Sequence, residues 1–158
     1  MNNATRSAIH WTSSAADFIA RIPPFLSQTA LRFAFGFPFF FSGLTKWDGF
    51  GRISEGALFL FADEFKLHLF GGEIAYPFPA LMAHFSGTAE IVLPLMLFVG
   101  LGTRFAALGL LVMTLIIQLT VPDGWANFHL PWAAMALAIM HLGAGPFSLD
   151  ALLTRKVR

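Results

Sequence analysis

The sequence predicts an all-α integral membrane protein, a four-helix bundle with both termini on the inner side and one extra short helix in a loop on the outer side. Composition is the first observation behind this prediction: 56% of the 158 residues are apolar and only 12% are charged, about half the ~25% that is usual for a soluble domain. The second is that apolar residues gather in four runs of 17 residues or more, three clear and one weaker. Runs of that length are typical of helices that cross a lipid bilayer.

The composition also excludes several other classes. Ten Lys and Arg balance nine Asp and Glu, for a net charge of +1, which leaves no basic excess for binding nucleic acid. A disordered chain needs low hydrophobicity and high charge, the reverse of this sequence. Cysteine is absent, so the chain has no disulfide, no thiolate metal site and no cysteine nucleophile. The chain has nineteen Phe and one Tyr. So many aromatic rings without a polar group indicate that the protein is surrounded by the lipid bilayer.

Residues 1–24 are expected to form a cytoplasmic N-terminal segment, in which residues 14–22 make a short amphipathic helix on the membrane surface. Pro23 and Pro24 end this helix before the first span. The transmembrane domain, residues 25–146, then consists of four spans at 25–43, 80–102, 105–121 and 128–145. At a rise of ~1.5 Å per residue, each can cross the ~30 Å hydrocarbon layer. Residues 147–158 form a basic cytoplasmic tail.

The long loop between the first two spans, residues 44–79, carries the extra helix. Ser54 can cap a helix over residues 55–70, with Glu55 in its first turn. Four apolar residues then share one face of this helix: Leu58, Phe61, Phe65 and Leu69. The segment is too highly charged to cross the membrane, so we expect it to lie over the bundle at the outer surface.

The charges between the spans predict the orientation. The side with both termini carries six basic and two acidic residues, a net charge of +4, whereas the opposite side carries three basic and six acidic residues, a net charge of −3. Cytoplasmic loops of membrane proteins are enriched in Lys and Arg, so both termini are expected in the cytoplasm. Trp47, Tyr76 and Trp125 mark the outer interface, and Trp11 marks the inner one.

Ionisable residues inside the spans are the leading functional candidates, because a charge in lipid is costly unless it is paired. Arg32 lies about 10 Å into the first span from one side, and Glu90 about 15 Å into the second span from the other. Both are thus expected near mid-membrane, where antiparallel neighbours can pair them. Such a pair can fix the helix register, or it can act as a proton relay or as a clamp for a quinone carbonyl or an oxyanion. His141, about 20 Å into the fourth span, is either a proton relay or a helix-to-helix hydrogen bond.

The remaining polar residues of the spans carry weaker signals. Gln118 is expected to hydrogen-bond between helices. His84 and His129 lie near the outer face with Lys46 and are candidates for an anion or metal site, but no metal-ligand spacing supports them, and no metal site is predicted. Haem is disfavoured because His84 and His141 differ in depth by roughly 14 Å and cannot bind one haem together.

Two stretches of the sequence resemble the DoxX family of small bacterial membrane proteins. LRFAFGFPFFFSGLTKW (31–47) has an Arg early in the first span and a Lys just beyond it, and AEIVLPLMLFVGLGTRFAALGLLVMTL (89–115) has a Glu in the second span and a Gly-Leu-x-Thr-Arg turn. Four positions match the family pattern: Arg32, Lys46, Glu90 and Arg104. The resemblance implies a four-helix bundle in the bacterial inner membrane with both ends cytoplasmic.

The resemblance also implies a link to respiratory redox chemistry, since the family takes its name from a subunit associated with a quinol oxidase and has members in thiosulfate:quinone oxidoreductase. We therefore expect a subunit of a quinone-linked redox assembly, in which Arg32 and Glu90 bind or protonate the quinone and His141 relays the proton. The further ligand-binding candidates are Lys46, Gln118 and His84. Without cysteine, the electrons have to come from a partner subunit, so whether the chain is itself an enzyme stays open.

Two alternatives belong to other functional classes. The chain can be a non-catalytic scaffold whose acidic, aromatic outer loop docks a periplasmic protein or a metal-binding peptide, as the resemblance to other family members implies. It can also be a small transporter, which requires a homodimer because four helices barely enclose a path for a solute. Ala134 and Ala138 in the fourth span permit the close helix contact that a dimer needs.

Overall fold

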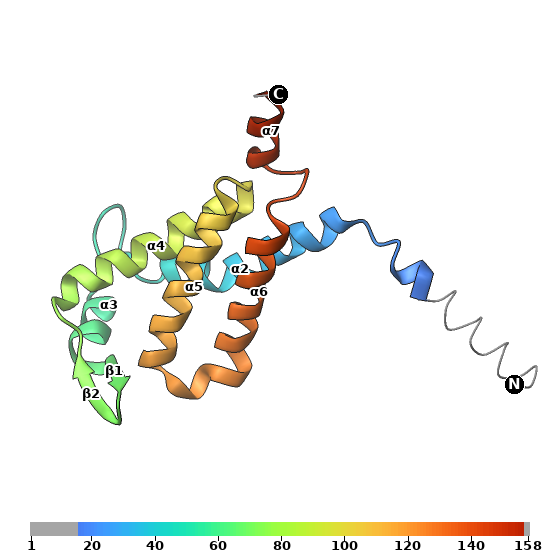
Figure 1. The fold of residues 1–158 in the computed structure, drawn as a ribbon. Helices are drawn as coiled ribbons and strands as arrows, with labels where there is room; N and C mark the ends of the chain where they lie inside the picture. Colours follow the sequence, from blue (N-terminus) through green and yellow to red (C-terminus); the bar gives the residue numbers. More distant parts are fainter. Residues whose placement is uncertain (1–15, 157–158) are drawn as a thin grey trace, which may run out of the picture.

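The computed structural model describes residues 16–156, and most of them are helical (Figure 1). Four helices form the body of the protein: α2 (Pro24–Leu44), α4 (Pro79–Val99), α5 (Thr103–Thr120) and α6 (Leu130–Leu142). They fall on the four predicted spans, but α6 is shorter than expected because the chain enters it through a 3₁₀ turn, η2 (Pro122–Gly124), and a π turn, η3 (Trp125–His129). Three of the four helices begin at or next to a proline, whose fixed φ suits the first turn of a helix.

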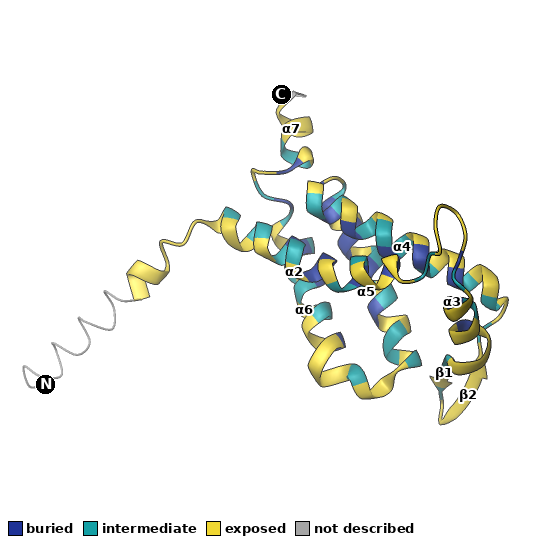
Figure 2. Ribbon diagram, turned by 180° about the vertical axis from the view of Figure 1, so that it is seen from behind, coloured by how far each residue is buried: buried dark blue, intermediate teal, exposed yellow. Residues whose placement is uncertain are grey.

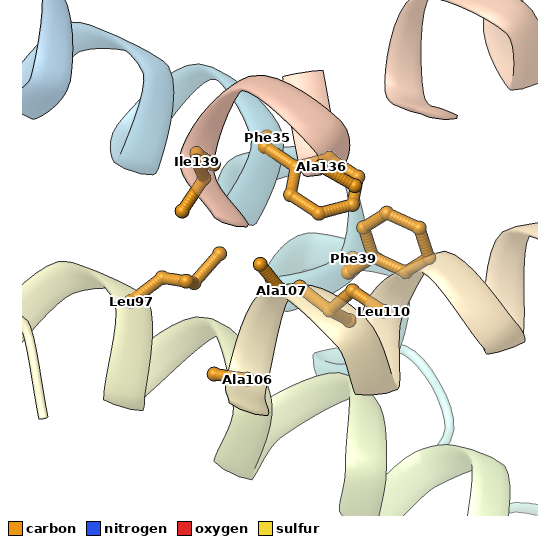
Figure 3. Packing of buried hydrophobic residues seen from close by; sticks show 8 residues of the cluster. All are labelled: Phe35, Phe39, Leu97, Ala106, Ala107, Leu110, Ala136 and Ile139. Atoms are coloured by element: carbon orange, nitrogen blue, oxygen red, sulfur yellow. The ribbon is translucent and has the colours of Figure 1, made fainter. Parts of the chain in front are cut away.

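The four helices pack in a ring, because α2 and α5 are each in contact with both α4 and α6. Their common core combines the rings of Phe35 and Phe39 from α2 with Leu97 from α4 (Figure 3). The residues that face these side chains from α5 and α6 are mostly small: Ala106, Ala107, Leu110, Ala136 and Ile139. Alanines at these positions let α5 and α6 approach closely, and the large rings of α2 fill the remaining space.

The outward faces of these helices are apolar as well, and Figure 2 shows them largely exposed. Phe37, Val92, Leu115 and Leu137 are each more than 40% exposed, and soluble proteins rarely present apolar surface on this scale. Among the described helices, α4 and α5 are the two that are long and apolar enough to cross a membrane. The polar residues of α2, Arg32 among them, and the 13-residue length of α6 keep those two helices below that criterion.

The two ends of the molecule differ in structure (Figure 1). One end, which we call the hairpin end, carries the segments that join α2 to α4 and α5 to α6. The other, which we call the α7 end, carries the tight turn between α4 and α5 and the short helix α7 (Leu149–Lys156). In the orientation predicted from the charges, the hairpin end is the outer one.

A helix begins in the loop after α2 where the sequence predicts it. The N–H of Ala57 donates to the hydroxyl of Ser54 at 3.2 Å, so Ser54 caps α3 (Glu55–Phe59). The helix continues through the π turn η1 (Leu60–Glu64) and ends at Phe65, whose backbone is extended. Ile53, Ala57, Phe61 and Ala83 form a second small core here, which packs this segment against α4.

Beyond Phe65 the predicted helix is wrong, because the chain forms a β-hairpin. The strands β1 (Lys66–Leu69) and β2 (Gly72–Ala75) pair antiparallel, with Leu67 opposite Ile74 and His68 opposite Glu73. Gly71 has a positive φ in the turn between them, which glycine adopts at no steric cost. The protein is therefore mostly helical rather than all-α.

Residues 16–23, just before α2, extend away from the helices in Figure 1. Residues 16–19 form one helical turn, and Phe18 and Ile19 on it are strongly exposed. The predicted surface helix over residues 14–22 falls partly outside the described residues, and Trp11 falls wholly outside them.

Candidate functional site

Glu90, in the middle of α4, is 3% exposed and forms an ion pair. The Nζ of Lys46, two residues beyond the end of α2, lies 2.5 Å from its Oε2. The hydroxyl of Ser86 donates to the other carboxylate oxygen at 2.8 Å, and the Lys46 ammonium also donates to the Ser42 hydroxyl at 3.0 Å. Both carboxylate oxygens therefore have a partner, which a buried charge requires.

The spacing of these residues explains why they meet. Ser86 and Glu90 are four residues apart on α4 and share one helix face. Ser42 is in the last turn of α2, and Lys46 follows the helix in one further turn, in which its N–H donates to the carbonyl oxygen of Gly43 at 3.1 Å. Gly43 lies at the contact between the two helices: a Cβ there would be 2.9 Å from the backbone carbon of Glu90. The absent side chain lets α2 approach α4 closely enough for Lys46 to reach the carboxylate.

The ion pair lines one part of a cavity of about 400 Å³. The walls come from α4, from α5 and from the segment between α2 and α4. Apart from the ion pair, the lining residues are Ser42, Phe61, Phe65, Tyr76, Met82, Phe85, Ser86, Ala89, Leu93, Gly109, Val112, Met113, Ile116, Ile117, Thr120 and Val121. Most of them are apolar, and a concave apolar site with a few convergent polar groups is the usual form of a small-molecule site.

Two hydrogen bonds connect the segment between α2 and α4, residues 45–78, which we call the hairpin segment, to the end of α5. The Tyr76 hydroxyl and the Thr120 Oγ1, which both line the cavity, lie 2.6 Å apart. On strand β1, the Nδ1 of His68 lies 3.1 Å from the carbonyl oxygen of Leu119. These contacts hold the hairpin segment over the cavity at the hairpin end of the molecule.

Arg32 does not pair with Glu90, so that prediction is wrong. Its side chain is 1% exposed, and its Nη2 donates to the carbonyl oxygen of Phe147 at 2.9 Å, near α7. The guanidinium also packs against Gly100, at the end of α4, which is ten residues from Glu90, or about 15 Å along a helix. A long basic side chain can extend toward the end of its helix, and Lys46 reaches Glu90 from the opposite end instead.

Asp150, on α7, is the acidic partner of the Arg32 region. Its two carboxylate oxygens accept the backbone N–H groups of Gly102 and Thr103 at 2.7 and 2.9 Å, so the carboxylate caps the N-terminus of α5. Burial raises the pKa of Asp150, but these hydrogen bonds and the positive charge of Arg32 outweigh it and hold the pKa below its ordinary value. The residues predicted to meet at mid-membrane thus lie in two separate places: Lys46 forms an ion pair with Glu90, and Arg32 bonds to the Phe147 carbonyl and interacts with Asp150 through charge alone.

The other predicted site residues lie outside the cavity lining. His141 is exposed at the end of α6, where its backbone carbonyl lies 3.4 Å from an Arg104 nitrogen. His84 is exposed beside the ring of Trp47, with its Nδ1 2.7 Å from the carbonyl oxygen of Ala80. Neither ring takes part in the cavity, because the helix turns both of them toward the surface.

Gln118 joins two segments, as its predicted interhelical role requires. Its Oε1 lies 2.6 Å from the Nδ1 of buried His129, and its amide donates to the carbonyl oxygen of Pro122 at 3.1 Å. Gln118 therefore connects α5 with η3 rather than lining the cavity. Within residues 16–156, no three acidic or histidine side chains gather in a way that holds a metal ion.

Of the predicted ligand-binding residues, only Lys46 and Glu90 line the cavity. Ser42 and Ser86 were not predicted, although their four-residue spacing from Lys46 and Glu90 is a signal that could find them. Tyr76 was predicted only as a marker of the membrane interface, and nothing in its sequence neighbourhood predicts the contact with α5.

Comparison with known proteins places this arrangement in a family. A family model described as DoxX matches residues 27–123, more than half of the chain. A relative from Haemophilus influenzae, described as an uncharacterized protein, is 28% identical over 142 residues, which cover 82% of this chain and 85% of the relative. No solved structure gives a significant match. The matched region contains α2, the hairpin segment, α4 and α5, and with them the Lys46–Glu90 pair, and the chain therefore belongs to the DoxX family of membrane proteins.

Proposed function

We propose that this DoxX-family protein is an inner-membrane subunit of a quinone-linked redox assembly, and that the cavity beside Glu90 holds the quinone head. One observation carries the proposal: a mostly apolar cavity of about 400 Å³ contains a buried, hydrogen-bonded ion pair. A quinone combines an apolar ring with carbonyl oxygens, so it fits walls of this composition with one cluster of donors. Other apolar carbonyl compounds share that chemistry, so a test of the proposal needs an apolar ketone without a quinone ring for comparison.

Lys46 is the residue that would hold a quinone carbonyl. An ammonium group has three donor hydrogens, and two of them already go to Glu90 and Ser42. The third is available to a ligand oxygen inside the cavity. Glu90 and Ser42 orient the ammonium, and Ser86 in turn holds the Glu90 carboxylate. The carboxylate next to the ammonium is the group proposed to exchange a proton during quinone chemistry.

A bound quinone supplies two-electron, two-proton redox chemistry, and the chain supplies the binding site and the protons. The absence of cysteine rules out thiols as electron carriers within the chain. The electrons are therefore expected to come from a partner subunit, and the proposal is that of a subunit rather than of a complete enzyme.

The test is quinone binding to the purified protein in lipid nanodiscs, followed by a change in melting temperature and by equilibrium titration. We expect wild-type protein to bind a ubiquinone or menaquinone analogue, and Lys46→Met with Glu90→Gln to bind it at least about tenfold more weakly, since one charged hydrogen bond is worth ~1.5–3 kcal/mol. His84→Gln is the matched control, because His84 lies on the same helix but outside the cavity. Equal binding by the double variant, or stronger binding of an apolar ketone without a quinone ring, contradicts the proposal.

A second candidate function, a scaffold that docks a periplasmic protein, is favoured by two aromatic side chains at the hairpin end. Phe50 and Phe70 are fully exposed at the tips of two loops, and acidic Asp48 and Glu73 lie close to them in the sequence. Exposed aromatic residues next to charged ones are typical of interfaces. The test is affinity purification from the native host with Phe50→Ser and Phe70→Asn: one partner that stays at full stoichiometry with both variants excludes this surface as its docking site.

A further inference from the structure

We infer that the cavity opens sideways into the bilayer between α4 and α5 and is covered by aromatic side chains toward the hairpin end, so that its ligand is a membrane-dissolved amphiphile with an apolar tail. The identity of that ligand as a quinone rests on the proposed function. The opening itself is a property of the helices and exists whatever molecule enters it.

The mouth of the cavity is formed by Phe85 on α4 and by Val112 and Ile116 on α5. These three residues line the cavity, yet they are 63%, 49% and 44% exposed. A side chain that lines a cavity and is also exposed lies where the cavity meets the surface. Two other lining residues meet the surface as well, Ser42 beside the ion pair and Val121 just past the end of α5, so the α4–α5 mouth is the widest apolar part of the rim. Since α4 and α5 are the described helices that are long and apolar enough to cross a membrane, this mouth faces lipid.

The floor of the cavity lies where α4 and α5 touch, at Leu93 and Gly109. A Cβ at Gly109 would lie 2.9 Å from the Cδ1 of Leu93, so the leucine occupies the space that the glycine leaves. Leu93 follows Glu90 by three residues, which places both on one face of α4. The ion pair is therefore next to the floor, and a ligand whose polar head reaches it has its tail directed to the mouth.

Aromatic rings of the hairpin segment cover the roof of the cavity. Phe61 is 7% exposed, and its ring packs edge-on against Phe65 and Tyr76, with centroids 5.2 and 5.5 Å away. Tyr76 is in turn hydrogen-bonded to Thr120 on α5. A water-soluble molecule that approaches from the hairpin end meets this packed layer before it reaches the ion pair.

These features select a class of ligand. A charged molecule that enters through the mouth has to pass apolar residues on a lipid-facing surface, which is costly. An amphiphile already dissolved in the bilayer brings its polar head to Lys46 and leaves its tail among the lipid chains. The tail gains no hydrophobic energy there, because lipid is as apolar as the mouth, and its role is to confine the ligand to the membrane.

The experiment uses the absence of cysteine in the chain to place single thiols. Ala89→Cys puts a thiol in the cavity wall, Phe70→Cys puts one at the fully exposed hairpin tip, and Leu97→Cys puts one in the fully buried core. Each full-length variant in nanodiscs is treated with one of two reagents. N-pyrenylmaleimide dissolves in lipid, whereas 2-sulfonatoethyl methanethiosulfonate is charged and stays in water.

We expect Ala89→Cys to react with the maleimide and to react with the sulfonate on the order of 50-fold more slowly than Phe70→Cys does, because a charge near mid-bilayer is costly. Leu97→Cys should react with neither reagent. Reaction of Ala89→Cys with the sulfonate at a rate close to that of Phe70→Cys overturns the sideways opening, and so does a lack of reaction with both reagents.

A second measurement separates the opening from the identity of the ligand. A quinone with an isoprenoid tail should protect Ala89→Cys from the maleimide, and a tail-less quinone with the same ring should protect it less at equal total concentration. If both protect equally, the tail requirement is wrong. If the maleimide pattern holds and no quinone protects, the opening stands and the proposed quinone function fails.

Discussion

The Nζ of Lys46 and the Oε2 of Glu90 lie 2.5 Å apart and join the end of α2 to the middle of α4. Both side chains are largely withdrawn from solvent, with exposures of 13% and 5%. Removal of one partner from such a pair leaves an uncompensated buried charge, which costs far more than removal of both. The pair is therefore expected to be strongly coupled in stability as well as in ligand binding.

Lys46→Met alone should destabilise the protein by about 3–5 kcal/mol, because it leaves the Glu90 carboxylate buried without its cation. Lys46→Met combined with Glu90→Gln should cost less than the single change, since no buried charge remains. Unfolding in mild detergent, followed by circular dichroism, measures both. A double variant that is as unstable as Lys46→Met shows that the two residues do not act as a pair.

Gly43→Ala should destabilise the contact between α2 and α4. Its new Cβ would lie 2.9 Å from the backbone of Glu90, where no flexible side chain can move aside, and overpacking of this kind costs ~1–3 kcal/mol. Gly56→Ala is the matched control, because nothing lies within 4 Å of a Cβ there and alanine favours a helix. Melting temperatures should fall for Gly43→Ala and stay level or rise for Gly56→Ala; an equal response contradicts the close contact.

The positions of the four long helices could be predicted because hydrophobic runs of that length have few other solutions. The pairing of their polar residues could not, because position in the sequence gives the depth of a Cα atom and not that of the end of a long side chain. Arg32 and Lys46 both have long side chains, and the Arg32 guanidinium lies nearly three helical turns from the level of Glu90. The β-hairpin was not predicted because Phe61, Phe65 and Leu69 fit the period of a helix. The signal for a turn is the pair Gly71–Gly72, which follows these residues.

Tyr76→Phe should loosen the hairpin segment from α5. It removes the hydroxyl that lies 2.6 Å from Thr120 Oγ1, and a neutral hydrogen bond contributes ~1 kcal/mol. Hydrogen exchange in residues 66–75 should become faster, while exchange in the core of α4 stays unchanged. Thr120→Val removes the other partner, so the double variant should exchange no faster than either single one; a further increase means that the two groups act separately.

Neutralisation of Asp150 should release α7 from the N-terminus of α5. The pKa of Asp150 is lower in the folded protein than its ordinary value of 3.8, so its stabilising contribution is fully present above about pH 4 and is lost as the pH falls through the folded pKa. A spin label attached at Leu153→Cys, a position that is 54% exposed on α7, should become more mobile as the pH falls from about 5 to about 2, the range in which Asp side chains titrate. Asp150→Asn should show the mobile spectrum already at pH 7, since the loss of charge at a helix N-terminus costs ~1 kcal/mol or more.

Asp63→Asn, which removes an exposed carboxylate at the hairpin end, is the control and should leave the label unchanged. A label that stays immobile in Asp150→Asn shows that the apolar contacts of α7, rather than the carboxylate, hold it in place.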